Sequence, residues 1–242
     1  MRPQSHPVGV PAGPVTLQGD LTVSECPQGL VIFSHGSGSS RHSPRNRFVA
    51  ERLQRAGLAT LLMDLLTPEE DRIYSNRFDI DLLTRRLLEC AAWAQRQPLT
   101  VGLPVGLFGA STGAASALRA AARLGPRAGA VVSRGGRPDL AADALGRVLC
   151  PTLLIVGGRD PEVLDLNRRA YDRMTAAVKR LEVVPGATHL FAEPGTLERV
   201  ADLAAGWFIH YLPQALPQAA EVGPLREVCH GHPETSASAS TL

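Results

Sequence analysis

A serine flanked by small residues lies between an apolar run and a stretch of good helix formers. Gly109-Ala110-Ser111-Thr112-Gly113 follows the apolar run Val105–Phe108 and precedes an Ala- and Leu-rich stretch over 114–123. The apolar run is typical of a strand buried in a parallel sheet, and Ala and Leu favour helix. A G-x-S-x-G motif in this context predicts a sharp turn that exposes the serine hydroxyl and aims the first helical amides at developing negative charge. Because the chain has 23 glycines, a closely packed turn without chemistry is the alternative.

Two later residues have the types that a serine nucleophile needs as partners. Asp160 follows the apolar run 152–156 and two glycines, and His189 lies in a loop after the last expected strand, 180–184. A nucleophilic serine requires a base and a third group that orients the base. The order Ser111, Asp160, His189 is the one expected for an α/β-hydrolase. Singly, Asp160 before Pro161 fits a helix cap and His189 a surface residue; together, at successive strand ends, they favour a catalytic triad. Asp139 is the alternative acid, and a helix cap explains it better.

The rest of the chain alternates between strand-like and helix-like segments. Helices are expected over 44–56, 79–95, 162–177 and 196–212, with a short one over 140–146. Such alternation predicts a mostly parallel sheet with helices on both faces, with the ligand outside the carboxyl ends of the strands. Residues 15–212 are expected to form one domain that opens with an N-terminal hairpin around Gln18-Gly19-Asp20. The proline-containing segment 1–14 is expected to be a flexible arm, and 213–242 a low-complexity disordered tail.

Four motifs together resemble the α/β-hydrolase superfamily, and within it the dienelactone-hydrolase-like branch, over about residues 15–212. The resemblance implies that Ser111 is the nucleophile, His189 the general base and Asp160 its orienting acid. It also implies that the backbone amides of Ser37 and Thr112 form an oxyanion hole. Dienelactone hydrolases carry cysteine at the nucleophile position, whereas this chain has serine, so a general esterase is expected. The motifs are VIFSHGSGSS (31–40), GLFGASTGAA (106–115), LLIVGGRD (153–160) and GATHLF (186–191).

Other polar residues at strand ends are candidates for binding substrate. His35 is expected chiefly to shape the oxyanion turn, and Asp64 to bind loop backbone. Arg41 is one such candidate. Arg134 and Arg137 flank two glycines at a strand end, where their guanidinium groups can face the cleft, and the alternative is that they form salt bridges with nearby acids or are solvated. The segment 133–151 contains only a loop and one short helix, so no large lid is expected.

The bulk properties narrow the class of protein. The chain has 242 residues and a formal net charge of +2, which gives no indication of a nucleic-acid partner. No apolar run approaches the roughly 20 residues of a membrane span, and the first residues lack the apolar core of a signal peptide, so a cytoplasmic location is expected. The four cysteines have no metal-ligand spacing and are expected to be free thiols, with no metal or cofactor.

These inferences predict a serine hydrolase that cleaves small to medium carboxylic esters through an acyl-enzyme. The expected partner is a small-molecule ester, and the expected state is a monomer or homodimer. An amidase, peptidase or lactonase that uses the same triad is one alternative. A non-catalytic binding protein of the same fold is another, and the presence of all three triad residues argues against it.

Overall fold

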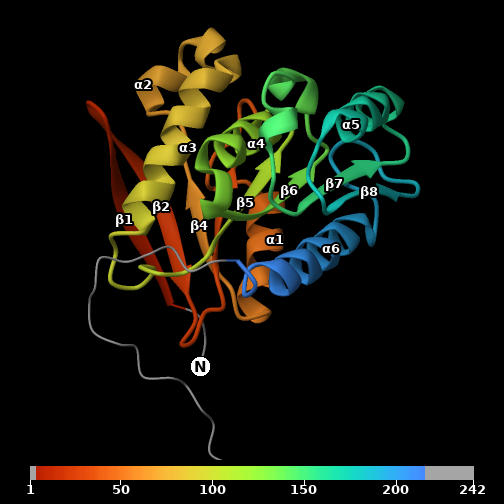
Figure 1. The fold of residues 1–242 in the computed structure, drawn as a ribbon. Helices are drawn as coiled ribbons and strands as arrows, with labels where there is room; N and C mark the ends of the chain where they lie inside the picture. The colour runs from red at the N-terminus through yellow and green to blue at the C-terminus, as the bar shows by residue number, and fades with distance from the viewer. Residues whose placement is uncertain (1–3, 216–242) are drawn as a thin grey trace, which may run out of the picture.

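The computed structural model describes residues 4–215 and contains one eight-stranded sheet with helices on both faces (Figure 1). The strand order is β1-β2-β4-β3-β5-β6-β7-β8. Neighbouring strands from β4 to β8 are parallel, while β2 is antiparallel to both β1 and β4. The strands are β1 (Gln4–Ala12), β2 (Val15–Val23), β3 (Leu30–Ser34), β4 (Ala59–Met63), β5 (Val105–Ala110), β6 (Ala128–Arg134), β7 (Thr152–Gly157) and β8 (Lys179–Val184).

The helices divide the core into two layers. Helices α3, α4 and α5 cover one face of the sheet, and α1 and α6 cover the other (Figure 1). The central strands β3, β4, β5, β6 and β7 are buried along their whole length, as continuous apolar runs between two helical layers require. The helices are α1 (Pro44–Arg55), α2 (Pro68–Asp71), α3 (Ile80–Ala94), α4 (Thr112–Leu124), α5 (Pro161–Arg173) and α6 (Thr196–Tyr211). Four 3₁₀ turns complete the described chain: η1 (Tyr74–Phe78), η2 (Gly125–Arg127), η3 (Pro138–Ala141) and η4 (Leu145–Arg147).

The N-terminal segment differs from the sequence expectation. The prediction of a flexible arm over 1–14 is wrong for residues 4–12, which form the edge strand β1. Pro7 and Pro11 point to solvent, and an edge strand tolerates prolines because their missing N–H groups need no partner there. The prediction of a hairpin turn at residues 18–20 is also wrong. Residues 15–23 are one strand, and the chain reverses at residues 13–14 instead. Gly19 lies inside β2 because the side chain of Met63 on β4 leaves no room for a Cβ there.

Three smaller expectations can be compared with the structure. The short helix predicted over 140–146 is replaced by the 3₁₀ turns η3 and η4. Cys90 and Cys150 are buried free thiols, as expected, whereas Cys26 is disulfide-bonded and the prediction of a free thiol is wrong there. Cys229 and the tail over 216–242 lie outside the described residues.

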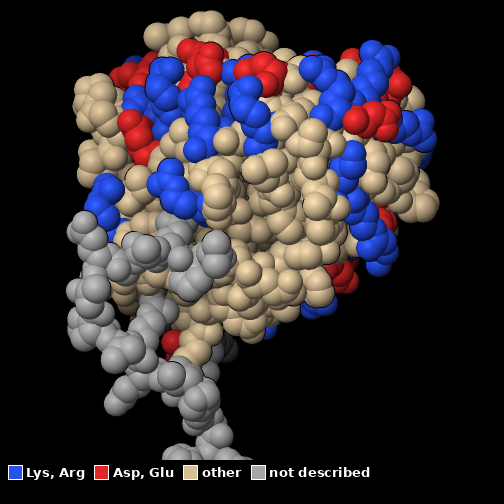
Figure 2. Space-filling model, viewed as in Figure 1, with Lys and Arg blue, Asp and Glu red and all other residues tan. Residues whose placement is uncertain are grey.

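Two surface properties concern the classes of partner considered above. Over residues 4–215, the structure contains no helix of the length and apolar character that crossing a membrane requires. Basic and acidic side chains are interspersed along the upper edge of the face drawn in Figure 2. On that face, therefore, positive charge does not form one continuous patch.

Candidate active site

The register of the central strands brings the candidate residues to one edge of the sheet. Ser34 at the end of β3 pairs with Gly109, and Ala110 at the end of β5 pairs with Arg134 at the end of β6. The loops that follow these strands therefore leave the sheet side by side at its carboxyl edge. This is where open α/β sheets bind their ligands.

Ser111 occupies a strained turn between β5 and α4. Its backbone has φ 52° and ψ −122°, and Phe191 is the other non-glycine residue with positive φ among those described. Gly109 and Gly113 make the turn possible. A Cβ on Gly109 would lie 2.6 Å from the carbonyl oxygen of Gly113, and one on Gly113 would lie 2.5 Å from that of His35. The glycines of the motif are thus required by close backbone packing, and the strain falls on the serine.

A continuous chain of polar contacts joins the three residues predicted as a triad. The Nδ1–H group of His189 donates to Oδ2 of Asp160 at 2.7 Å, and the opposite ring atom Nε2 lies 3.3 Å from Oγ of Ser111. Asp160 stands at the N-cap position of α5 but makes no side-chain cap hydrogen bond. The carboxylate therefore serves the imidazole, and the alternative of a simple helix cap does not describe it. With Nδ1 protonated, Nε2 is free to accept the serine proton.

The loop that carries His189 is fixed by residues that sequence reasoning missed. The ring of Phe191 is 2% exposed and packs in the core formed with α1 and α6, and its backbone has φ 54°. Glu193 accepts a hydrogen bond from the backbone N–H of Thr188 at 3.1 Å, and its hydrogen bonds with Thr188 lower the pKa of the Glu193 carboxyl. The sequence signal for this anchor is the apolar pair Leu190-Phe191 directly after His189, of which the folded protein buries Phe191 and leaves Leu190 exposed.

His35 is engaged inside the protein. The backbone N–H of Leu65 donates to its Nε2 at 3.2 Å, and its Nδ1–H donates to the carbonyl of Gly36 at 2.9 Å. Burial lowers the pKa of His35, so the neutral ring that these two bonds require is favoured. The ring thus ties the loop after β3 to the end of β4 and has no nitrogen left for a substrate.

The two backbone amides expected to form the oxyanion hole, those of Ser37 and Thr112, differ in whether they already donate a hydrogen bond. The backbone N–H of Thr112 begins α4, where helical amides have no intrahelical partner, and it makes no hydrogen bond to another described residue. The backbone N–H of Ser37 donates to the side-chain Oγ1 of Thr112 at 2.8 Å. One of the two amides implied by the family resemblance is therefore occupied by a side chain.

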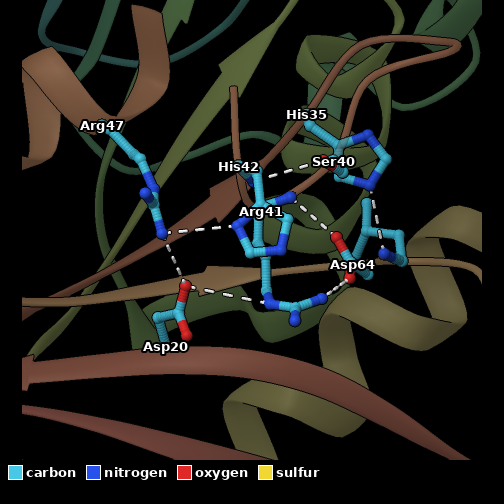
Figure 3. A network of polar contacts seen from close by, with 8 residues as sticks. Asp20, His35, Ser40, Arg41, His42, Arg47 and Asp64 are labelled. Atoms are coloured by element: carbon cyan, nitrogen blue, oxygen red, sulfur yellow. Dashed lines mark hydrogen bonds and ion pairs between the residues drawn. The ribbon is translucent and has the colours of Figure 1, made fainter. Parts of the chain in front are cut away.

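Arg41 is part of a network that braces the loop between β3 and α1. Its guanidinium pairs with Asp64, and its backbone N–H donates to Oδ1 of the same carboxylate at 2.7 Å. Figure 3 shows the Arg41 side chain lying between Asp64 and Asp20, with Arg47 reaching Asp20 from the other side. Arg41 is thus paired with two carboxylates, and Asp64 binds loop backbone as the sequence suggested.

The two arginines near the end of β6 differ in their partners. Arg137 binds Asp139 through two bonds of 2.9 and 2.7 Å, which raise the pKa of Arg137 and account for Asp139 without a helix cap. Arg134 is only 8% exposed, and its Nη1 has no hydrogen-bond partner in the described part of the chain. Burial and the nearby charge of Arg45 lower the pKa of Arg134 to about 10. Neither Arg134 nor Arg45 forms an ion pair with a residue in the described range 4–215.

A mostly parallel sheet with a serine at a strained strand-to-helix turn defines the α/β-hydrolase fold. Within this fold the chain belongs to the dienelactone hydrolase family, whose model matches residues 26–206.

Two solved structures show which known proteins the chain resembles. It is 54% identical to a dienelactone hydrolase from Anabaena variabilis, over 88% of this chain and 100% of that one, with a TM-score of 0.85. Est1E from Butyrivibrio proteoclasticus has the same fold at 16% identity, with a TM-score of 0.73 over 84% of this chain and 98% of that one.

The chain spans about half the length of the curated relatives that it matches. A Mycobacterium tuberculosis protein named "Putative phosphoribosyl transferase" is 63% identical over 205 residues, which are 85% of this chain and 46% of that protein. The name applies to a protein about twice as long as this chain.

Proposed function

We propose that this chain is a serine hydrolase that cleaves small to medium carboxylic esters through an acyl-enzyme. The observation that carries the proposal is the contact chain from Asp160 through His189 to Ser111 at the carboxyl edge of the sheet. Membership of the dienelactone hydrolase family supports hydrolysis in general. A serine hydroxyl is less acidic than a cysteine thiol and therefore needs a general base close by to remove its proton. Nε2 of His189 lies within reach of the Ser111 hydroxyl and can do this.

In the proposed acylation step, Oγ of Ser111 attacks the ester carbonyl carbon while its proton passes to Nε2 of His189. The tetrahedral intermediate collapses when the carbon–oxygen bond to the alcohol breaks and His189 returns the proton to the leaving alkoxide. In the deacylation step, His189 removes a proton from water, and the resulting oxygen attacks the acyl carbon. The bond between the acyl carbon and Oγ then breaks, His189 returns its proton to Oγ, and release of the acid leaves Ser111 and His189 in their starting forms. Asp160 stabilises the transient imidazolium and keeps the Nδ1–H tautomer in place throughout.

The substrate is proposed to carry an acidic group, because Arg134 is a buried cation without a counter-ion among residues 4–215. Burying a charge without a partner costs several kcal/mol, and the second unpaired guanidinium, on Arg45, adds repulsion. A carboxylate or phosphate group on the substrate would relieve both costs. Arg41 and Arg137 are already paired with acids, so of the three candidate arginines only Arg134 is proposed to bind substrate. The backbone carbonyl of Arg134 accepts from the N–H of Ser111 at 3.1 Å, so the backbones of the two residues lie side by side.

The first test is labelling with a fluorophosphonate, combined with ester kinetics. The wild-type chain should be labelled and should hydrolyse p-nitrophenyl esters, and Ser111→Ala should lose both properties while it stays folded. Ser5→Ala, an exposed serine on the edge strand β1, is the matched control and should behave like the wild type. Labelling that survives in Ser111→Ala would refute the assignment of the nucleophile.

The acidic-substrate proposal has a separate test. A half-ester of a dicarboxylic acid is compared with the neutral diester of the same length. The wild type should favour the charged half-ester in kcat/KM, and Arg134→Gln should remove the preference, while Arg137→Gln should retain it. An unchanged preference in Arg134→Gln would refute the role of this residue without affecting the triad.

A lactonase is the second candidate, because the Anabaena relative at 54% identity is named as a dienelactone hydrolase. A lactone is an internal ester and uses the same steps. Lactones in the same kinetic panel separate the two: higher kcat/KM for lactones than for open-chain esters of equal size would favour the second candidate.

A further inference from the structure

The amide expected to hold the substrate oxygen already has an acceptor. The backbone N–H of Ser37, in the loop after β3, donates to Oγ1 of Thr112 at 2.8 Å. Thr112 is the first residue of α4 and is 4% exposed. Oγ1 therefore stands in the acceptor position of the Ser37 amide, and a substrate oxygen cannot take that position unless the threonine side chain rotates away.

The hydroxyl of Thr112 has one proton to donate and no described acceptor for it. A threonine hydroxyl can accept two hydrogen bonds and donate one, and the only contact found for Oγ1 among residues 4–215 is the one it accepts from Ser37. A threonine inside a helix can donate to the carbonyl four residues earlier, as Thr84 does to Ile80 at 2.6 Å. Thr112 begins its helix, so that arrangement is not available to it. A buried hydroxyl proton without an acceptor is costly.

Two unused donors thus belong to one residue, next to the nucleophile. The backbone N–H and the side-chain O–H of Thr112 both follow Ser111 directly, at the positive end of α4. Their common acceptor would be an oxygen bonded to the carbon that Ser111 attacks.

We propose that the hydroxyl of Thr112 is a catalytic residue that donates its proton in a hydrogen bond to the oxyanion. The inference rests on the proposed ester hydrolysis and assigns to a side chain the part that family resemblance gives to the Ser37 amide. Ser37 is then a positioning residue: its N–H holds Oγ1 and polarises the O–H bond. Hydrogen bonds in such a chain strengthen one another, so the donor becomes stronger as negative charge develops.

The test compares variants at position 112 with a matched threonine elsewhere. Thr112→Val keeps the shape and β-branching of the side chain but has no hydroxyl to donate. Its extra methyl group also lies against the Ser37 amide, so that amide cannot reach the oxyanion either. We expect kcat to fall on the order of 100-fold, as for the loss of one oxyanion donor, with KM changed by less than about threefold. Thr112→Ser keeps the hydroxyl and should stay within about fivefold of the wild type. Thr84→Val removes a buried helical hydroxyl that lies on α3, and its kcat should be unchanged.

A transition-state analogue provides a readout that a structural defect would not move. The affinity for an arylboronic acid should fall in Thr112→Val in parallel with kcat, while the affinity for the product acid stays constant. If valine prevents folding, Thr112→Ala replaces it. Alanine leaves the Ser37 amide open to the substrate, so we expect a smaller loss in kcat than for valine, about tenfold.

The outcomes separate this inference from the proposed function. A Thr112→Val enzyme as active as the wild type, or faster, would show that the hydroxyl merely occupies the hole, and would overturn the inference. If Ser111→Ala retained hydrolysis and labelling, or the wild type had neither, the proposed function would fail and this inference with it. Loss in Thr112→Val with recovery in Thr112→Ser would support it.

Discussion

Gly113 is the glycine of the serine motif whose replacement has the best-defined physical consequence. A Cβ at this position would lie 2.5 Å from the carbonyl oxygen of His35 and closer still to that of Ser34. Both atoms are backbone at the end of β3, so no side-chain rotation can relieve the overlap. Helix α4 and strand β3 must instead separate by roughly 1 Å, and forced overpacking of this kind typically costs 1–3 kcal/mol. We expect Gly113→Ala to lower the free energy of unfolding by about 3 kcal/mol, the upper end of that range.

Gly206 in α6 is a matched control, since it is also a helical glycine. A Cβ there would meet nothing within 4 Å. Gly206→Ala should therefore raise the free energy of unfolding by about 0.5–1 kcal/mol, because alanine loses less backbone entropy in a helix. Urea denaturation followed by circular dichroism measures both values.

The same displacement in Gly113→Ala moves Ser111 away from His189, and a misplacement of about 1 Å can lower the rate on the order of 100-fold. A Gly113→Ala protein as stable as Gly206→Ala would refute the packing argument.

Three further predictions concern the acid, the buried histidine and the substrate. Asp160→Asn should lower kcat on the order of 10⁴-fold, because the amide can stabilise the imidazole tautomer that cannot accept the serine proton. Asp139→Asn should leave kcat nearly unchanged, because the partner of its carboxylate within residues 4–215 is Arg137 and not His189. Steady-state kinetics with the opposite ranking would move the triad acid to Asp139. Burial lowers the pKa of His35 below 6.5, so the unfolded chain binds the proton first and the free energy of unfolding should fall as the pH drops below 6.5. His35→Asn should flatten this dependence in urea titrations between neutral and acidic pH, and an unchanged slope would contradict it. Finally, η3 and η4 are too short to form a lid over the cleft, so added methylenes gain little of the roughly 0.8 kcal/mol available on burial. A series of p-nitrophenyl esters should show the highest kcat/KM at about two to six acyl carbons, and a maximum at about twelve or more would show that a lid exists.

The candidate triad is encoded in local sequence. Apolar runs predicted the central strands, and the small residues after them predicted the strand-end loops that hold Ser111, Asp160 and His189. Because parallel strands must end at one edge of the sheet, the order of these three residues was enough to predict that they meet there. Local pattern was insufficient at the N-terminus. The prolines of β1 suggested a loose arm, but pairing with β2 and an exposed edge position accommodate them.

Only the tertiary structure decided which partner each polar side chain around the triad has. From the sequence, Arg41, Arg134 and Arg137 were all candidates for binding substrate, since each is a long cation at or beyond the end of a strand. Folding pairs Arg41 with Asp64, 23 residues away, and leaves Arg134 buried with no acidic partner among the residues that the structure describes. The contact of Ser37 with Thr112 joins residues 75 positions apart. Backbone propensity and hydrophobic period act over a few residues and therefore fix strands, helices and turns. The partner of a side chain depends on which loops the sheet brings within about 3 Å of each other, and that distance exists only in the folded protein.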